Sequence, residues 1–205
     1  LFKSYHRIPD KRKFLSDYKA QFKRPKLSDY KSSPSSDPYV FFMASLWKQE
    51  EQTNRFRAHF INACTSNTHI TFDGCFAPRT KNDISGYEAL TTSGRISMND
   101  YLNKTKASAF VFNTPAVKSC HGWKLAEYLC LGKAIISTPL SRALPSPLND
   151  GEHLLYTDGT PEDIAKKANA ILMDPSLKHQ LETQSKQYFE EHLKPRRVIE
   201  RLLAH

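Results

Sequence analysis

The sequence contains no uninterrupted apolar run of about 18 residues, which is the length that a membrane-spanning helix needs. It also contains no C-x-x-C motif, because its four cysteines are separated by 11, 45 and 10 residues. This spacing argues against a zinc site or a thioredoxin-type centre, and four reduced thiols suit a cytosolic protein. No secretory apolar segment follows Leu1, and because the chain does not begin with Met, we expect it to be a piece of a longer one.

Acidic residues are scarce, since 21 Asp and Glu face 30 Lys and Arg in 205 residues, which gives a formal charge of +9. The excess is uneven: residues 1–38 hold ten bases and four acids and so carry +6, whereas the other 167 residues carry +3. A strong basic charge is a first sign of nucleic-acid binding. Because no RNP, zinc-finger or helix-turn-helix pattern accompanies it, we predict no nucleic-acid partner.

Residues 1–38 are predicted to form an irregular leader or interdomain connector, separate from a single domain over residues 39–205. The segment ends in a Ser- and Pro-rich run, residues 31–38, which resists both helix and strand. Its bases also suit contact with an anionic membrane or a nucleic acid, which is the alternative interpretation. The aromatic residues within it follow no steady period: Tyr5, Phe14, Tyr18, Phe22 and Tyr30.

From residue 39 onward, short apolar runs alternate with helical patterns. Apolar runs without polar alternation are typical of strands buried on both faces. We therefore predict a Rossmann-like α/β fold, a parallel sheet with helices on both faces and a C-terminal helical tail. The predicted strands are residues 39–44, 69–73, 108–113, 134–138 and 154–156, with a long loop over 74–95. The predicted helices are 50–64, a short one from 97, 123–131, 160–174, a second long one ending at 193, and 196–204.

The helix predicted over residues 50–64 turns one face to the core. Its spacing directs Phe56, Phe60 and Ile61 inward and places Arg55 and Arg57 around them. The two arginines are therefore expected on the outer face.

One loop between a buried strand and a helix, residues 114–122, is the most informative segment for function. Ligands of open α/β sheets bind beyond the carboxyl ends of the strands, where such loops meet helix N-termini. Free backbone N–H groups of residues 121–123 and the positive helix end form a ready anion site. Gly122 lets a phosphate approach the main chain, and Lys124 adds a cation. Glu127, one turn further on, can accept hydrogen bonds from sugar hydroxyls.

Several consecutive motifs follow this loop at regular spacing. Residues 127–139 read Glu-Tyr-Leu-Cys-Leu-Gly-Lys-Ala-Ile-Ile-Ser-Thr-Pro, and residues 150–153 read Asp-Gly-Glu-His. A helix start at residues 160–163 and a break at residues 173–177 come next. Together, over residues 95–173, these motifs resemble the donor-binding half of a GT-B glycosyltransferase, most similar to the retaining group one type.

The resemblance implies a function and a set of site residues. Glu127 would bind the ribose hydroxyls of a nucleotide sugar, amides near residues 121–123 would hold its diphosphate, and Arg95 and Ile96 would lie near the base. The nucleotide-diphosphate sugar is the substrate, and no cofactor or metal is required, because the helix end and basic side chains neutralise the leaving diphosphate. The expected donor-binding residues are Ser119, Cys120, His121, Gly122, Trp123, Lys124, Glu127, Lys48, Arg55, Arg95 and Ile96.

The implied enzyme is a hexosyltransferase that moves a sugar from the nucleotide to a glycan or lipid-linked acceptor. Its acceptor-binding domain would precede this chain, so that the chain alone would be half of the enzyme. We expect a cytoplasmic protein, with residues 1–38 at the crossing between the halves and close to the inner face of an anionic membrane.

Two departures from the family pattern concern the donor site. Ser119 stands where the family has the first glutamate of its pair, the carboxylate that contacts the donor sugar, so no catalytic residue is assigned. Residues 44–46, Ala-Ser-Leu, stand where the family has Gly-Arg-Leu, and Lys48 or Arg55 is expected to replace that arginine. A noncatalytic α/β scaffold that keeps the fold for protein contacts is therefore the alternative function.

Other suggestive residues are assigned more ordinary roles. Cys120 and His121 are adjacent and have no orienting partner, so we do not expect a nucleophile–base pair. His153 has no second histidine at a metal-binding spacing, so it is expected at the rim of the crevice. Trp47 and Trp123 are each assigned either to the core or to a ligand contact.

Overall fold

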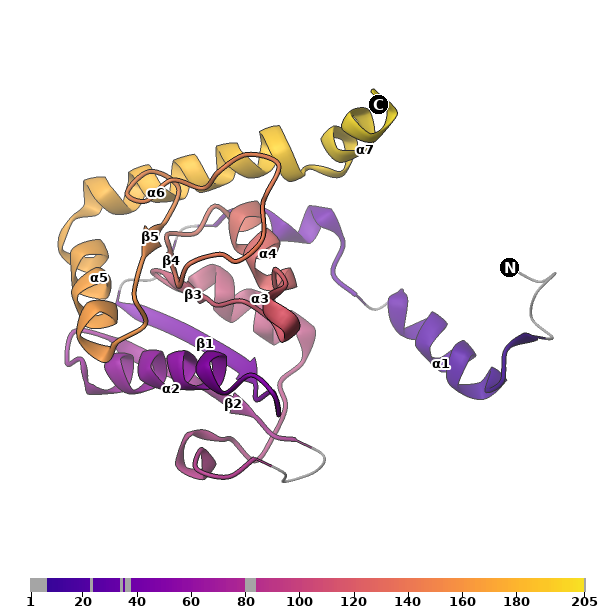
Figure 1. Ribbon diagram of the computed structural model, residues 1–205, viewed down its shortest axis with the longest axis horizontal. Helices are drawn as coiled ribbons and strands as arrows, with labels where there is room; N and C mark the ends of the chain where they lie inside the picture. The colour runs from indigo at the N-terminus through magenta and orange to yellow at the C-terminus, as the bar shows by residue number, and fades with distance from the viewer. Residues whose placement is uncertain (1–6, 23, 34, 36–37, 80–83, 205) are drawn as a thin grey trace.

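The computed structural model describes residues 7–22, 24–33, 35, 38–79 and 84–204. Its strands pair in parallel within two groups, one of two strands and one of three (Figure 1). The first group is β1 (Tyr39–Ser45) with β2 (Thr71–Ala77), and the second is β3 (Val111–Asn113), β4 (Ile135–Ser137) and β5 (Leu155–Tyr156) in that order. The predicted parallel α/β architecture is confirmed.

The two groups of strands meet where β1 lies beside β3. The backbone N–H of Ala109 donates to the carbonyl oxygen of Tyr39 at 2.7 Å, and the N–H of Phe41 donates to the Ser108 hydroxyl oxygen at 2.8 Å. The spatial order is therefore β2-β1-β3-β4-β5. In a sheet of this order the connections on either side of the β1–β3 junction run in opposite directions, which makes the junction a topological switch point.

The second strand is longer than its sequence indicates. Residues 69–73 were the expected strand and residues 74–95 the expected loop, but β2 starts at Thr71 and continues to Ala77. A Cβ atom at Gly74 would lie 2.4 Å from the backbone oxygen of Phe42, so the glycine allows β1 and β2 to pair closely along seven residues. The loop prediction over residues 74–77 is therefore wrong, because Gly74 serves strand pairing rather than a turn.

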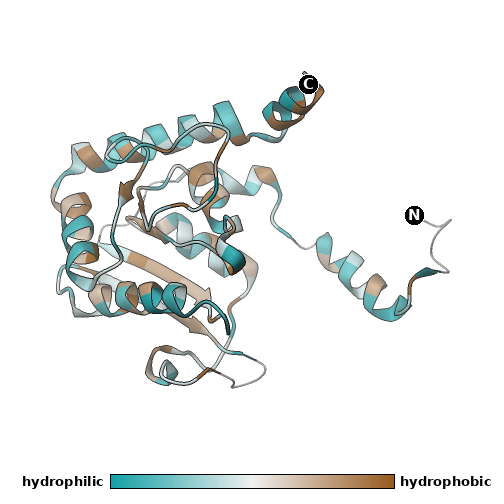
Figure 2. Cartoon of the chain, viewed as in Figure 1, coloured by the Kyte–Doolittle hydropathy of each residue, from teal (hydrophilic) through white to brown (hydrophobic). Residues whose placement is uncertain are grey.

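The helices lie on both faces of the sheet. They are α2 (Glu51–Ser66), α3 (Met98–Ala107), α4 (Trp123–Leu131), α5 (Pro161–Met173) and α6 (Pro175–Tyr188), which continues as a π-helical turn to Leu193. Phe112 and Ile136 belong to a buried cluster shared with α2 and α5, whereas Val111 and Ile135 belong to a second cluster shared with α4 and α6. Because alternate residues of a strand point to opposite faces, this division shows both faces covered. The strands are accordingly apolar in Figure 2.

The first helix corrects the expectation that residues 1–38 are irregular. Residues 11–21 form α1 (Lys11–Gln21), and a short 3-10 helix, η2 (Leu27–Tyr30), follows. The Asp10 side chain caps α1 by accepting a hydrogen bond from the Lys13 backbone N–H at 2.8 Å, which satisfies one of the free donors at its start. The aromatic residues Phe14, Tyr18 and Phe22 lie four residues apart, which is a helical period.

The last helix is α7 (Pro195–Leu203), close to the predicted residues 196–204. Neither α1 nor α7 has a buried side chain, and both project from the body in Figure 1. Among the described residues, no helix is both long and apolar enough to cross a membrane.

Candidate functional site

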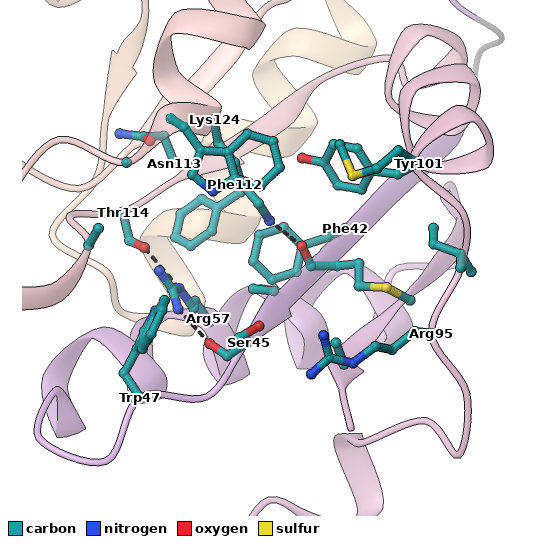
Figure 3. A pocket seen from close by; sticks show the side chains of 18 residues that line it. Phe42, Ser45, Trp47, Arg57, Arg95, Tyr101, Phe112, Asn113, Thr114 and Lys124 are labelled. Atoms are coloured by element: carbon teal, nitrogen blue, oxygen red, sulfur yellow. Dashed lines mark hydrogen bonds between the residues drawn. The ribbon is translucent and has the colours of Figure 1, made fainter. Parts of the chain in front are cut away.

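A cavity of about 230 Å³ opens at the carboxyl ends of β1 and β3 (Figure 3). It lies at the switch point of the sheet, which is where open α/β folds bind ligands. Its walls come from residues 42–45 and 47 at the end of β1, 112–114 and 116 at the end of β3, 95, 96, 98 and 101 around the start of α3 and 122–124 at the start of α4, together with Arg57 and Ala77.

Arg57 on α2 spans the junction of β1 and β3. Its Nε donates to the Thr114 hydroxyl oxygen at 3.0 Å, and its Nη1 donates to the carbonyl oxygen of Ser45 at 2.8 Å. Burial lowers the pKa of Arg57 to about 10, which leaves the guanidinium charged at neutral pH. The cavity therefore has a fixed positive charge held between the two strand ends.

Lys124, in the first turn of α4, reaches β1 from the other side. Its Nζ donates to the carbonyl oxygen of Met43 and lies 5.0 Å from the centre of the Phe42 ring. Burial, with the charge of Arg57 as a second cause, lowers the pKa of Lys124 to about 7. The amine therefore loses its proton more readily than an exposed lysine, and an anion in the cavity would favour the ammonium form.

The cavity has one sign of charge. Among the described residues that line it, every charged one is a base: Arg57, Arg95 and Lys124. The N-terminus of the nine-residue helix α4 adds its free N–H groups and the positive end of its dipole. Because unopposed positive charges are costly to bury, this arrangement is expected where a negatively charged ligand completes the site.

The loop that leads into α4 has an unusual backbone. Lys118 and Ser119 have φ angles of 54° and 57°, in the left-handed region that disfavours residues with a Cβ atom. The Lys118 N–H donates to Glu50 Oε1 at 2.6 Å, and the Ser119 carbonyl oxygen accepts from the Ser141 hydroxyl at 2.5 Å. Strained backbone of this kind clusters at functional sites. After it, Cys120 is exposed and His121 Nε2 is buried without a hydrogen-bond partner in the described part of the chain.

Glu127 lies one turn beyond Lys124 on α4 but faces a different neighbour. Its Oε1 accepts a hydrogen bond from the Tyr30 hydroxyl at 2.6 Å, whereas its Oε2 is buried and has no hydrogen-bond partner in the part of the chain that the structure describes. Burial raises the pKa of Glu127 to about 7, although the Tyr30 hydrogen bond and the charge of Lys124 oppose that effect. The carboxyl is thus covered by η2, outside the lining of the cavity.

Three solved structures have a similar fold. The C-terminal domain of the glycosyl transferase group 1 family protein LpcC from Francisella tularensis shares 14% identity over 83% of this chain and 99% of that one, with a TM-score of 0.57. TarM shares 10% identity over 84% of this chain and 36% of its own, with a TM-score of 0.55. Sucrose-phosphate synthase from Thermosynechococcus elongatus shares 12% identity over 88% of this chain and 51% of its own, with a TM-score of 0.54.

This chain has the GT-B C-terminal fold. The predicted resemblance is confirmed at the level of architecture, and at these identities the similarity concerns the fold. The chain spans about a third of the TarM structure and half of the sucrose-phosphate synthase structure. No protein-family model matches the sequence, and neither does any curated protein.

The GT-B fold brings part of the expected donor-binding set together. Five of its members line the cavity: Arg95, Ile96, Gly122, Trp123 and Lys124. The remaining members lie outside the lining: Lys48, Arg55, Ser119, Cys120, His121 and Glu127. Lys48 and Arg55, the two expected replacements for the family arginine, are both exposed.

Arg57 is the charged cavity residue that the sequence argument misses, since it was expected on the outer face of its helix. The structure corrects this placement, because Asn54, Arg57, Ala58 and Ile61 all lie on the buried face of α2. Their spacing of three, four and seven residues is a helical stripe. The signal was present, but an arginine within a stripe is readily assigned to solvent because bases are rarely buried.

The two tryptophans whose roles were left open both line the cavity. Trp47 is 37% exposed and Trp123 is 57% exposed, so neither is a core residue. The Trp123 ring centre lies 5.8 Å from that of Tyr101, and both rings border the same space. The cavity therefore combines positive charge with aromatic surface.

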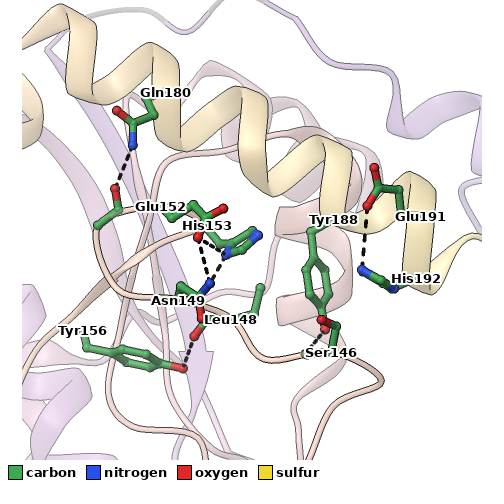
Figure 4. Close-up of polar contacts among 11 residues, drawn as sticks. Ser146, Leu148, Asn149, Glu152, His153, Tyr156, Gln180, Tyr188, Glu191 and His192 are labelled. Atoms are coloured by element: carbon green, nitrogen blue, oxygen red, sulfur yellow. Dashed lines mark hydrogen bonds and ion pairs between the residues drawn. The ribbon is translucent and has the colours of Figure 1, made fainter.

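His153 has a structural role in the loop that precedes β5 (Figure 4). Its Nδ1 accepts a hydrogen bond from the Asn149 N–H at 3.1 Å, and its ring packs edge-on against Tyr188 of α6 at 5.4 Å. Gln180 donates to the carbonyl oxygen of Gly151 at 3.0 Å and ties the same loop to α6. Within the described ranges, no group of three or more His, Cys, Asp or Glu residues is placed to hold a metal ion.

Proposed function

We propose that the cavity binds the diphosphate of a nucleotide sugar and that the chain is the donor-binding domain of a glycosyltransferase. The enzyme would transfer a hexose to a glycan or lipid-linked acceptor. The observation that carries this proposal is the charge of the cavity, because each charged residue in its described lining is a base. A diphosphate supplies the two or more negative charges that such a lining lacks.

Arg57 is proposed as the phosphate-binding arginine. The family pattern has that residue where Ser45 stands, and the Arg57 guanidinium donates to the carbonyl oxygen of Ser45 from the neighbouring helix. The positive group is thus supplied from α2 instead of from β1. Lys124 and the N–H groups at the start of α4 would neutralise the rest of the diphosphate as it leaves, so the reaction as proposed needs no metal.

The nucleoside is proposed to extend from the diphosphate past Trp123 toward Arg95 and Ile96. Trp123 offers a half-exposed ring on which a base can stack. Glu127 remains the proposed acceptor of the ribose hydroxyls, since its Oε2 has no hydrogen-bond partner among the described residues. Tyr30 would have to share or release the carboxylate when the ribose binds.

The wider organisation follows from the same proposal. Residues 39–205 form the nucleotide-sugar domain, residues 1–38 form the connector that leads into it, and a domain outside this chain supplies the acceptor site. A cytoplasmic location is proposed because nucleotide sugars are the donors and all four cysteines are free thiols in the structure.

Calorimetric titration of the chain with UDP, GDP, their sugars and the matching nucleosides tests the proposal. We expect one diphosphate series to bind, its nucleoside to bind at least tenfold more weakly, and Glu127→Ala to weaken the nucleotide. If no nucleoside diphosphate binds, or if uridine and guanosine bind as well as UDP and GDP, the assignment of the cavity to a diphosphate is wrong. If Glu127→Ala binds as tightly as the parent, the ribose role alone is wrong.

A noncatalytic domain that keeps the nucleotide site is the second candidate, and Ser119 favours it. The residue that would carry the donor-sugar carboxylate is a serine, is exposed and lies outside the cavity lining. Hydrolysis or transfer of a radiolabelled donor sugar by the protein would exclude this candidate.

A further inference from the structure

A short segment of the chain before β1, residues 27–32, lies along α4 and covers Glu127. Figure 1 shows this segment next to α4, and the two are in contact. The Tyr30 hydroxyl donates to Glu127 Oε1, and the Cys130 thiol donates to the carbonyl oxygen of Tyr30 at 3.9 Å. Tyr30 is therefore attached to the second turn of α4 by its side chain and to the end of α4 by its backbone.

Neither carboxylate oxygen of Glu127 is open to a ligand while this segment lies in place. Oε1 already accepts the Tyr30 hydroxyl at 2.6 Å, whereas Oε2 is buried and has no hydrogen-bond partner among the residues that the structure describes. A carboxylate can accept about four hydrogen bonds, so Tyr30 leaves most of this capacity unused. Access is the obstacle, and a ribose hydroxyl reaches Glu127 only when the segment moves away.

The contact that covers Glu127 is small enough for a ligand to displace. The described residues of η2 include none that is buried, and the Tyr30 ring packs half-buried against the cluster that α4 shares with α6. A buried oxygen without a hydrogen bond has lost its hydration and gained nothing in return, which costs free energy. Burial accordingly raises the pKa of Glu127 to about 7. Two ribose hydroxyls would supply the donors that Tyr30 alone does not.

We propose that residues 27–32 act as a latch, in which the Tyr30 hydroxyl occupies the carboxylate that binds the ribose and leaves it when a nucleotide enters. This inference rests on the proposed function, from which it takes the ribose role of Glu127. The cavity takes up the diphosphate with the latch closed, because Tyr30 and Glu127 both lie outside its described lining. The ribose then displaces Tyr30, and occupation of the nucleotide site is passed to the connector.

The latch makes two classes of ligand behave differently. A ligand shifts an equilibrium only by the difference between its affinities for the two states. Pyrophosphate has no ribose, so it binds equally well with the latch open or closed. A nucleoside diphosphate reaches Glu127 only with the latch open, and its affinity is reduced by the fraction of molecules that are closed. Loss of the Tyr30 hydroxyl should therefore tighten nucleotide binding and leave pyrophosphate binding unchanged.

Calorimetric titration with UDP, GDP and pyrophosphate tests the latch on two tyrosine variants. We expect Tyr30→Phe to bind the nucleoside diphosphate roughly three- to tenfold more tightly, which is the range of one net hydrogen bond, and to bind pyrophosphate like the parent. Tyr39→Phe is the matched control, because Tyr39 also donates to a carboxylate, Asp73 Oδ2 at 2.9 Å, outside the cavity lining. This control should change neither affinity.

Two further measurements separate the latch from a merely structural role of Tyr30. In a Glu127→Ala background, Tyr30→Phe should leave nucleotide affinity unchanged, because the hydroxyl acts only through Glu127. A structural role would give the same change in both backgrounds. Hydrogen exchange of the amides of residues 27–32 should become faster with a bound nucleoside diphosphate and in Tyr30→Phe, but not with pyrophosphate.

Failure of the latch differs from failure of the proposed function. If no nucleoside diphosphate binds, the proposed function is wrong and the latch with it. If the nucleotide binds but Tyr30→Phe binds it equally well or more weakly, the latch alone is wrong. An equal gain for pyrophosphate, or slower exchange of residues 27–32 when the nucleotide is bound, would also overturn the latch and leave the assignment of the cavity intact.

Discussion

The cavity and the two terminal helices depart from the usual arrangement of a folded domain in opposite ways. In the cavity, Arg57 and Lys124 are charged groups with little solvent around them. On α7 and α1, leucine and phenylalanine side chains lie in solvent. Between these regions most apolar residues are buried and most charged residues are exposed, although Lys133 and Lys178 are buried as well. Each departure costs free energy in the isolated chain, which is why each indicates a ligand or surface that is not in the structure.

The largest expected effect is on the stability of the packed core, which lies between the cavity and the terminal helices in this comparison. Phe60 is fully buried and stacks on Phe112 with ring centres 4.4 Å apart. Phe60→Ala should lower the free energy of unfolding by about 3–5 kcal/mol through lost burial and a cavity. Urea denaturation followed by circular dichroism measures it. A loss below about 1 kcal/mol would show that the described core is not the stable part of the molecule.

The second effect is a loss of nucleotide affinity when Arg57, the fixed cation of the cavity, is replaced. Arg57→Gln should weaken binding of a nucleoside diphosphate by roughly ten- to a hundredfold, because a charge-assisted hydrogen bond of about 1.5–3 kcal/mol is lost. Arg55→Gln is the matched control, since it removes the same group from the exposed side of the same helix. Equal losses in the two variants would mean that the charge of α2 acts at long range and that the cavity position of Arg57 has no special role.

Arg57 also joins Ser45 to Thr114, so its replacement can disturb the fold. Arg57→Lys keeps a charge while losing the planar fork. We expect its affinity to lie between those of the parent and the glutamine variant. Unfolding curves for all three proteins separate a binding defect from a folding defect.

The third effect is a change of nucleotide affinity with pH, by up to tenfold per pH unit, that arises from Lys124. Its pKa of about 7 in the free protein should rise when an anion binds, so binding takes up a proton above pH 7. Affinity for a nucleotide sugar should therefore be constant well below pH 7 and fall as the pH rises above it. Lys124→Arg stays charged and should flatten this profile.

Glu127 titrates in the same range, because its pKa is also about 7. Its ionisation above pH 7 adds a negative charge near Lys124, which also disfavours an anionic ligand. Calorimetry from pH 6 to 9 on Glu127→Gln separates the two groups. If the profile of the parent is flat, neither group contributes to the binding of the phosphates.

The smallest effect is expected at the C-terminal helix. Leu202→Gln/Leu203→Gln should change the free energy of unfolding by less than about 0.5 kcal/mol, because neither side chain has a buried contact to lose. Urea denaturation of the parent and the variant checks this. A cost comparable to that of Phe60→Ala would contradict the distinction between a packed body and unpacked ends.

The sequence predicts those elements whose determinants are local. The helix 123–131 was predicted with its observed bounds, because Gly132 adopts φ 64° just beyond it and ends it in the usual left-handed conformation. The first helix was missed although Asp10 and the four-residue spacing of Phe14, Tyr18 and Phe22 are local signals too. An apolar stripe with nothing to pack on was assigned to irregular chain, since helices are ordinarily recognised by the face that they bury.

The site was less predictable, because its decisive contacts are long-range. The end of the loop leading into α4 lies at the cavity, yet Glu127 meets Tyr30, 97 residues away in the chain. Arg57 likewise reaches Thr114, 57 residues away. No spacing rule within a helix or loop predicts such pairs, because they depend on how strands are ordered in the sheet.

The sparse junction between β1 and β3 makes the floor of the cavity adjustable. Within each group the strands are paired by backbone hydrogen bonds, whereas between the groups a backbone bond from Ala109, a bond to the Ser108 hydroxyl and the bridge from Arg57 to Ser45 and Thr114 make the link. Each group can therefore behave as a stiff plate, and a small rotation between the plates widens or narrows the space at the strand ends without breaking either ladder. Ligands of different bulk could be accommodated by that rotation. Deuterium uptake would then be faster at the Phe41 and Ala109 amides than at their neighbours inside each plate, and a bound nucleotide would slow it.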